Sequence, residues 1–138
     1  MRRGARWRWS ILAGVVALLI VLGYLGVAEW RRRPVTPAAV MVPELSDEAR
    51  SGRDAFDRLC ATCHGGHASG GQSGPPLVHR IYGPAHHADV AFTLAVRRGV
   101  RAHHWRFGDM PPQLTVPVEE ISRIVRYVRE LQRANGIE

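Results

Sequence analysis

The apolar positions of the chain form one continuous run near its N-terminus and shorter periodic segments after it. The run covers residues 10–28, close to the roughly 20 residues that a helix needs to cross a bilayer. Trp7, Trp9 and Trp30 flank the run, as aromatic residues flank a membrane helix at its two interfaces. The pattern predicts a transmembrane helix with its membrane span at residues 11–28.

A cleaved signal peptide is the alternative interpretation of this segment, because a basic start is common to both. The apolar run is long for a signal peptide, and the charged segment 29–33 follows it without a small-residue cleavage site. We therefore predict an uncleaved anchor with basic flanks at residues 1–33. Residues 34–45 contain three prolines and little charge, which favours a semi-stiff tether after the anchor.

After the tether, apolar residues recur at helical spacing in three segments. These segments are residues 46–60, 89–99 and 117–134. Glycine- and proline-containing loops separate them, with one short helical turn expected at residues 77–83. The sequence shows neither the alternation typical of strands nor an internal repeat. Residues 46–138 are therefore predicted to form one all-α domain.

Two of the predicted helices begin at a candidate capping residue. Ser46 is expected to be the N-cap of the first helix, and Asp89 is expected to cap the second. The apolar stripe of the terminal helix consists of Ile121, Ile124, Val125, Val128 and Leu131. The arginines of this helix are expected to face mostly away from the stripe. They are Arg123, Arg126, Arg129 and Arg133.

The first helix of the domain leads into Cys60-Ala61-Thr62-Cys63-His64, the C-x-x-C-H pattern of covalent haem attachment. In this chemistry two thiols add to the two haem vinyl groups, and the intervening residues let both sulfurs reach one porphyrin edge. The next residue, His64, is then placed to offer an imidazole nitrogen to the iron. We predict one covalent haem c attached at Cys60 and Cys63, with His64 as the proximal iron ligand.

Other chemistries of a C-x-x-C pair agree less well with the chain. A thioredoxin-like redox pair needs a strand–helix context that the pattern does not show. A zinc site of this type needs a second cysteine pair, and the chain has only two cysteines. A structural disulfide would close a tight, strained loop. Haem attachment is therefore the preferred interpretation.

The formal charge of +7 is concentrated in the N-terminal segment. Residues 1–33 contain seven arginines and one acid, whereas residues 34–138 contain twelve arginines and eleven acids. The basic excess thus belongs to the flanks of the predicted span and not to the globular part. We therefore expect no nucleic-acid partner.

A haem iron with a proximal histidine has a distal position that is either filled or open. Met110 is the only methionine in residues 46–138, and it lies in a loop that Pro111 and Pro112 make rigid. A thioether is a soft, neutral ligand that favours ferrous iron and raises the reduction potential. We therefore predict Met110 as the distal iron ligand.

Histidines are the competing ligands for the distal position. They are His67, His79, the pair His86-His87 and the pair His103-His104. Any of them would give a haem with two histidine ligands, and the pairs also fit copper binding. His103, His104 and Trp105 lie near Met110 in the sequence and are expected to line the haem pocket or reach a propionate.

These residues together resemble a small single-domain cytochrome c of the class I type, here with an N-terminal membrane anchor. The resemblance covers about residues 46–138, and it implies an all-α cytochrome c fold of about three to five helices around one haem. Its motifs are Gly52 with Phe56, Cys60–His64, Gly74-Pro75-Pro76-Leu77, Met110-Pro111-Pro112 and the terminal helix with Tyr127.

The resemblance also assigns roles to individual positions. In this family the first and last helices cross at a glycine–aromatic contact. The residues expected at that contact are Gly52, Phe56, Ile124 and Tyr127. The Pro75 carbonyl is expected to accept the N–H of the proximal histidine and so orient its ring. Leu77 and Trp105 are expected in the haem pocket.

Membrane-anchored members of this family carry electrons between respiratory complexes or to a terminal acceptor. The resemblance therefore implies an electron-transfer protein and not an enzyme, because an iron ligated on both sides has no open position for a substrate. The expected partners are redox proteins, namely a membrane oxidase, reductase or dehydrogenase. Bacteria attach c-type haem outside the cytoplasmic membrane. We therefore expect a single-pass anchor in that membrane, with the haem domain on the periplasmic side.

Three other functions stay open at this point. The chain could be the haem c subunit of a larger membrane oxidoreductase, with which the anchor and tether agree equally well. An enzyme or sensor with an open iron would require Met110 to be absent from the iron. A plain membrane-anchored structural module is disfavoured by the Cys60–His64 motif.

Overall fold

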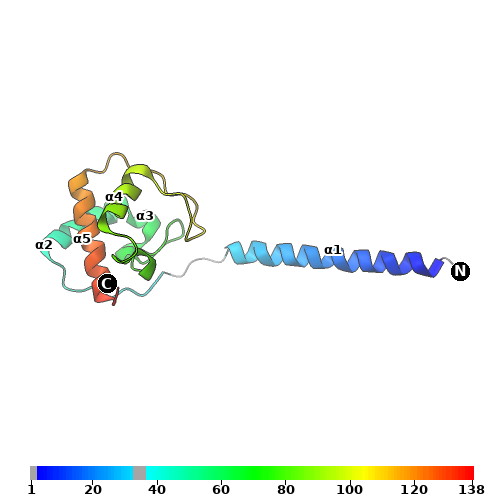
Figure 1. Ribbon diagram of the computed structural model, residues 1–138. Coiled ribbons are helices and arrows are strands. Elements are labelled where there is room, and N and C mark those ends of the chain that lie inside the picture. Colours follow the sequence, from blue (N-terminus) through cyan, green and yellow to red (C-terminus); the bar gives the residue numbers. More distant parts are fainter. Residues whose placement is uncertain (1–2, 33–36) are drawn as a thin grey trace. The chain divides into compact units, whose positions relative to one another are not determined.

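The computed structural model describes residues 3–32 and 37–138 of the chain, which divides into two compact units near residue 34. The first unit is the single helix α1, Arg3–Arg32 (Figure 1). The second unit contains all the other helices. Within the described ranges the only β-type pairing is one isolated bridge, so the predicted all-α fold is confirmed.

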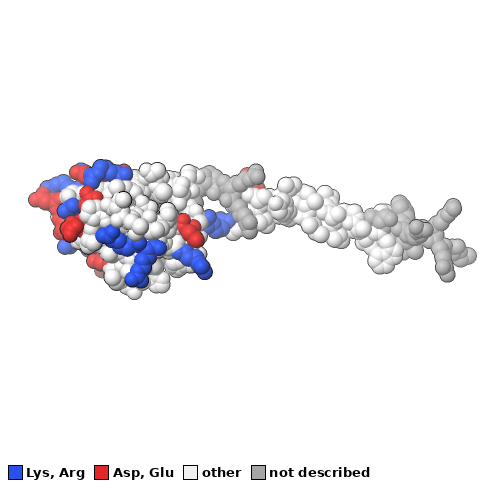
Figure 2. Space-filling view, turned by 90° about the horizontal axis from the view of Figure 1, so that it is seen from above, with Lys and Arg blue, Asp and Glu red and all other residues white. Residues whose placement is uncertain are grey.

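Helix α1 has the length and composition of a membrane span. Its segment Ile11–Trp30 has a mean hydropathy of 2.7, and none of it is buried within the protein. Figure 2 shows no charged side chain along the middle of the helix. A helix that exposes this much apolar surface is unfavourable in water, so it is consistent with the predicted anchor.

The second unit consists of three longer helices and three short ones. They are α2 (Asp47–Leu59), α3 (Ala61–His64), η1 (Gly66–Ala68), η2 (Arg80–Tyr82), α4 (Asp89–Arg98) and α5 (Val118–Ala134). The three longer helices match the three predicted segments to within two residues, and η2 lies within the short helical turn expected at residues 77–83.

The two capping predictions have different outcomes. The Ser46 hydroxyl accepts the N–H of Ala49 at 3.2 Å, so Ser46 is the N-cap of α2 as predicted. The prediction for Asp89 is wrong, because Ala88 occupies the N-cap of α4 and makes no side-chain cap. The Asp89 carboxylate is instead engaged by Arg129 of α5, 2.7 Å away.

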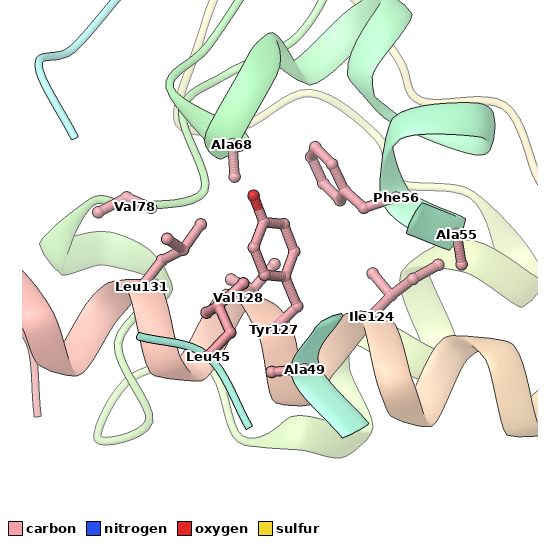
Figure 3. Packing of buried hydrophobic residues seen from close by; sticks show 10 residues of the cluster. All are labelled: Leu45, Ala49, Ala55, Phe56, Ala68, Val78, Ile124, Tyr127, Val128 and Leu131. Atoms are coloured by element: carbon pink, nitrogen blue, oxygen red, sulfur yellow. The ribbon is translucent and has the colours of Figure 1, made fainter. Parts of the chain in front are cut away.

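The core of the second unit is the crossing of α2 and α5 (Figure 3). A Cβ at Gly52 would overlap the carbonyl oxygen of Arg123, so the two backbones approach as closely as only glycine permits. One turn further along α2, the Phe56 ring meets the Tyr127 ring edge-on, with centroids 5.7 Å apart. The helix crossing expected from the resemblance is therefore confirmed.

The hydroxyl end of Tyr127 lies against the loop that follows the haem motif. Figure 3 shows the hydroxyl directed toward Ala68, and the oxygen lies 3.2 Å from Nδ1 of His67. Burial and then the charge of Asp57 raise the pKa of Tyr127 to about 12, with Arg53 acting in the opposite direction. The phenol is therefore neutral, and it joins the helix crossing to the loop.

Part of the segment that was expected to be a tether packs against the domain. Ala38 donates its N–H to the glycine-rich loop, and Met41 exchanges two hydrogen bonds with the Asn135 side chain, at 3.0 and 2.8 Å. Leu45 is buried in the core. Residues 33–36 lie outside the described part of the chain. From Ala38 onward the segment thus packs on the domain. Its backbone groups form hydrogen bonds with the domain, and it contributes the Leu45 side chain to the core.

Replacement of Gly52 by alanine should destabilise the second unit by about 1–3 kcal/mol, because the added methyl group meets backbone and forces α2 and α5 apart. Thermal unfolding followed by circular dichroism measures the change. Ser51→Ala is the matched control, since Ser51 is exposed on the same helix. An equal loss of stability in both variants would contradict the close crossing.

Candidate haem site

A cavity of about 510 Å³ lies between the helices and loops of the second unit. This volume is within the usual range of small-molecule and cofactor sites. All the site residues predicted from the sequence line it, and they come from the haem motif, from the segment between α3 and α4, and from the loop after α4. They are Cys60, Cys63, His64, Pro75, Leu77, Trp105 and Met110. The structure thus brings the predicted site together, while the ligand roles stay predictions.

The haem motif lies on a bend between α2 and the single turn of α3. Cys60 is both the C-cap of α2 and the N-cap of α3, with φ −123° and ψ −32°. Its carbonyl accepts the backbone N–H groups of Cys63 and His64. Cys60 is half-buried, whereas Cys63 is exposed. This turn is what directs both sulfur atoms and the imidazole at one cavity.

The glycine-rich loop folds directly against the motif backbone. A Cβ at Gly71 or at Gly74 would lie 2.5 or 3.0 Å from the carbonyl oxygen of Cys63. Gly65 adopts φ +74° at the end of α3, where other residues are strained. The glycines therefore let the loop return over the motif and bring Pro75 to the imidazole.

His64 is oriented by a backbone carbonyl. Its Nδ1 lies 2.9 Å from the Pro75 oxygen, and because a carbonyl can only accept, Nδ1 carries the proton. Burial lowers the pKa of His64, and the hydrogen bond to Pro75 opposes this effect. A neutral imidazole with an unprotonated Nε2 is the form that ligates a metal, and the hydrogen bond increases its basicity.

Cys60 has the properties of a thiol that is not a redox catalyst. Burial, followed by the proximity of Cys63, raises its pKa to about 11. Reactive dithiols instead need a lowered pKa. The environment of Cys60 therefore disfavours the thioredoxin-like interpretation.

Met110 is held in place by backbone contacts. It forms an isolated antiparallel bridge with Val100, in which both N–H···O distances are 2.9 Å. Gly99 adopts φ +73° and packs against the Met110 carbonyl, where a Cβ would lie at 2.5 Å. Asp109 accepts the N–H of Ala102 and closes the loop between them. The half-buried Met110 thus lines the cavity from a fixed backbone position.

Trp105 supplies a test of whether a haem fits these residues. Its indole N–H is buried and meets no acceptor with hydrogen-bond geometry. Burial raises the pKa of the nearby Tyr82 hydroxyl, and a side-chain interaction with Trp105 opposes this effect, although the two groups do not meet with hydrogen-bond geometry. A haem propionate is an acceptor that would satisfy a donor of this kind. The apolar cavity, the paired thiols, the oriented imidazole and this indole together fit a covalent haem.

A family model described as "Cytochrome C oxidase, cbb3-type, subunit III" matches residues 47–128. The chain belongs to this family. No curated protein and no solved structure matches it. The matched range includes the haem motif and Met110 and leaves α1 outside. The cofactor is therefore covalent haem c, and the resemblance to a small cytochrome c that follows an apolar N-terminal helix is confirmed.

One residue that positions the haem cavity of this cytochrome c domain was missed from the sequence. Arg129 is only 7% exposed, which corrects, for this residue, the prediction that the arginines of α5 face mostly away from the apolar stripe. Its guanidinium donates to Asp89 and Tyr82, each at 2.7 Å, and also to His87. It further contacts Gln132 at 2.6 Å. Arg129 therefore ties α5 to α4 and to the loop that forms one wall of the cavity.

The helical spacing of α5 could have predicted that Arg129 is buried. Arg129 follows Ile121 by eight residues and Val125 by four, so it lies on the apolar face of α5. Charge alone suggested an exposed position. By contrast, Arg126 is exposed and pairs with the equally exposed Glu48.

The remaining histidines fall into two groups. His67 contacts Tyr127, and His79 packs edge-on against Trp105 with ring centroids 5.1 Å apart. His87, His103 and His104 line the haem cavity, as expected for the latter two. Desolvation, followed by the neighbouring His103, His87 and His86, lowers the pKa of His104.

Arg129→Leu should destabilise the domain by about 2–4 kcal/mol, because it removes the donor to Asp89 and to the His87 carbonyl and leaves the Tyr82 carbonyl with Gln132 alone. The loop of residues 77–88 should then exchange its amide hydrogens faster. Arg126→Leu is the control and should cost less than about 1 kcal/mol, since the Arg126–Glu48 pair is exposed. Urea unfolding of the two variants measures both losses of stability. Equal losses would contradict the role of Arg129 in joining α5 to α4 and to the loop.

Proposed function

We propose that the protein is a membrane-anchored c-type cytochrome that carries single electrons through a haem c ligated by His64 and Met110. The observation that supports it is that one cavity is lined by Cys60, Cys63, an imidazole oriented by Pro75, and Met110. Met110 is also the only methionine of residues 46–138. The backbone of Met110 is also held in place by its bridge to Val100.

In this proposal each residue has a defined task. Cys60 and Cys63 hold the haem by thioether bonds, and the haem supplies one-electron chemistry at its iron. His64 presents Nε2 while Pro75 fixes its ring. Met110 presents its sulfur, which favours the reduced state. With His64 and Met110 both on the iron, no position would be left for a substrate, so the protein would transfer electrons and would not be an enzyme.

The segments divide the remaining tasks. We assign residues 1–33 to the anchor, 34–45 to the connection and 46–138 to the cytochrome c domain. The anchor holds the protein in the bacterial cytoplasmic membrane as a single pass, and the haem domain lies on the periplasmic side, where c-type haem is attached. The redox partners in this proposal are a membrane oxidase, reductase or dehydrogenase.

The charge distribution supports protein partners over nucleic acid. Residues 34–138 have a formal charge of only +1, from twelve arginines and eleven acids. Figure 2 shows both signs on the face of the domain that it presents. A mixed surface of this kind has no sustained basic stripe that would follow a phosphate backbone.

A second candidate function is the haem c subunit of a larger membrane oxidoreductase. The observation that favours it is the family itself, which is described as an oxidase subunit. Mild detergent extraction followed by size-exclusion chromatography distinguishes the two. A stoichiometric haem-containing partner would identify a subunit, and an isolated 15.3 kDa chain would identify a free carrier.

Met110→Ala should abolish the weak far-red sulfur–iron band of the oxidised protein, open the iron to carbon monoxide and lower the midpoint potential. Met110→His should restore six-coordinate iron at a lower potential than the parent. Absorption spectroscopy and redox titration of the purified protein measure these changes.

The control for this series is Met41→Ala, because Met41 is exposed and does not line the cavity. It should leave both the spectrum and the potential unchanged. If Met110→Ala also leaves them unchanged while a histidine variant loses its low-spin spectrum, then the haem has two histidine ligands and the assignment of Met110 is wrong.

The full chain should stay with the membrane fraction through a high-salt wash and be released only by detergent, because α1 exposes an apolar segment of 20 residues. A chain that begins at Pro37 should be soluble and keep the haem spectrum, since it retains the packed segment from Ala38 onward. Quantitative release of the full chain by salt would contradict a membrane span.

A further inference from the structure

Three histidines that the haem does not require meet at the edge of its cavity. They are His86 and His87, from the turn before α4, and His104, from the Met110 loop. Each can offer one ring nitrogen, and these nitrogens all lie within 4.8 Å of one another. The ring centroids are 4.8 to 5.8 Å apart. Among the described residues this is the one group of three such side chains.

His87 is held in the orientation that metal-ligating histidines have. Its Nδ1 donates to the Ile81 carbonyl at 2.6 Å, so Nε2 is the nitrogen that is available to a metal. The buried Arg129 binds the His87 carbonyl from α5. The backbone N–H groups of His86 and His87 both donate to the Gly83 carbonyl, at 3.0 and 2.8 Å. The turn that presents these two rings is therefore fixed by its own backbone and by the domain core.

The third histidine comes from an ordered loop. The bridge between Val100 and Met110 closes this loop, and Asp109 accepts the N–H of Ala102 inside it. His104 projects from the loop as an exposed side chain. His103 packs beside it, with centroids 4.2 Å apart, but its Nδ1 contacts the Arg101 carbonyl and it lies outside the group of three. Two separate segments thus meet at the three rings.

We propose that His86, His87 and His104 bind one divalent transition-metal ion, Zn²⁺ or Cu²⁺, at the edge of the haem cavity. Imidazole nitrogens suit these two ions, whereas Mg²⁺ and Mn²⁺ prefer oxygen ligands. Three nitrogens around a tetrahedral zinc at about 2.0–2.1 Å lie about 3.4 Å apart, so small rotations of exposed rings complete the geometry. A fourth position is left for water.

The site is distinct from the predicted ligands of the haem iron, although two of its residues line the haem cavity. His87 and His104 line the haem cavity, whereas His86 does not, so the three nitrogens converge at the cavity edge. The proposal needs neither Met110 nor electron transfer. The two proposals therefore fail together only where His104 itself ligates the iron, which the spectrum of His104→Ala tests.

The test uses the full haem-loaded chain in detergent, in which both cysteines are consumed by haem and cannot bind the added metal. Equilibrium dialysis against Zn²⁺ or Cu²⁺, followed by metal and haem analysis, should give one retained ion per haem. Mg²⁺ and Mn²⁺ should not be retained. The Cu²⁺ form should show nitrogen hyperfine structure in its electron paramagnetic resonance spectrum, which reports imidazole ligands directly.

Two variants locate the ion. His86→Ala and His104→Ala should each weaken binding at least about 10-fold, because each removes a ligand from a three-ligand site. His67→Asn is the matched control and should bind as the parent does. His67 is an exposed histidine outside the cavity, and asparagine tolerates its φ of +54°.

Three results would overturn the proposal. The first is less than one ion per haem for both Zn²⁺ and Cu²⁺ at concentrations that saturate imidazole sites. The second is an equal loss of binding in His67→Asn and in the two ligand variants. The third is loss of the low-spin haem spectrum in His104→Ala without added metal, which would make that histidine a haem ligand. A failure of the Met110 series alone leaves this site unaffected.

Discussion

The close crossing of α2 and α5 is the constraint on which the rest of the cytochrome c domain depends. Gly52 lets the two backbones touch, and the Phe56–Tyr127 contact fixes the next turn. Helix α2 then delivers the haem motif at its C-terminal end, while α5 presents Arg129 one turn beyond the crossing. A single helix contact therefore positions both the haem motif, at one wall of the haem cavity, and Arg129, which secures the other wall.

The long segment between α3 and α4 has little regular structure, so its carbonyl groups need other partners. Side chains of α5 supply them. Gln132 is fully buried and donates to the carbonyls of Leu77 and Tyr82, while Arg129 also donates to Tyr82. The same segment presents Pro75 to the imidazole and His87 to the cavity. Buried polar groups of one helix thus replace the backbone ladder that the loop lacks.

Two ionisable groups of the haem motif favour their neutral forms. Burial lowers the pKa of His64 and raises that of Cys60, so both groups favour their uncharged forms. Met110 is neutral by nature. As iron ligands in the proposed function, His64 and Met110 would both be neutral, which favours the lower charge of reduced iron. The histidine group at the cavity edge would add a positive charge nearby when it binds a metal.

The sequence by itself determined the elements and the chemistry. The apolar run predicted α1, the helical spacing predicted α2, α4 and α5, and the motif at Cys60–His64 predicted the haem, because each of these signals is local. The tertiary structure decided what depends on distant partners. It buried Arg129, which charge alone placed outside, and it packed the expected tether onto Asn135. It also gathered three histidines from two loops, since only the folded backbone brings segments 17 residues apart to within 4.8 Å.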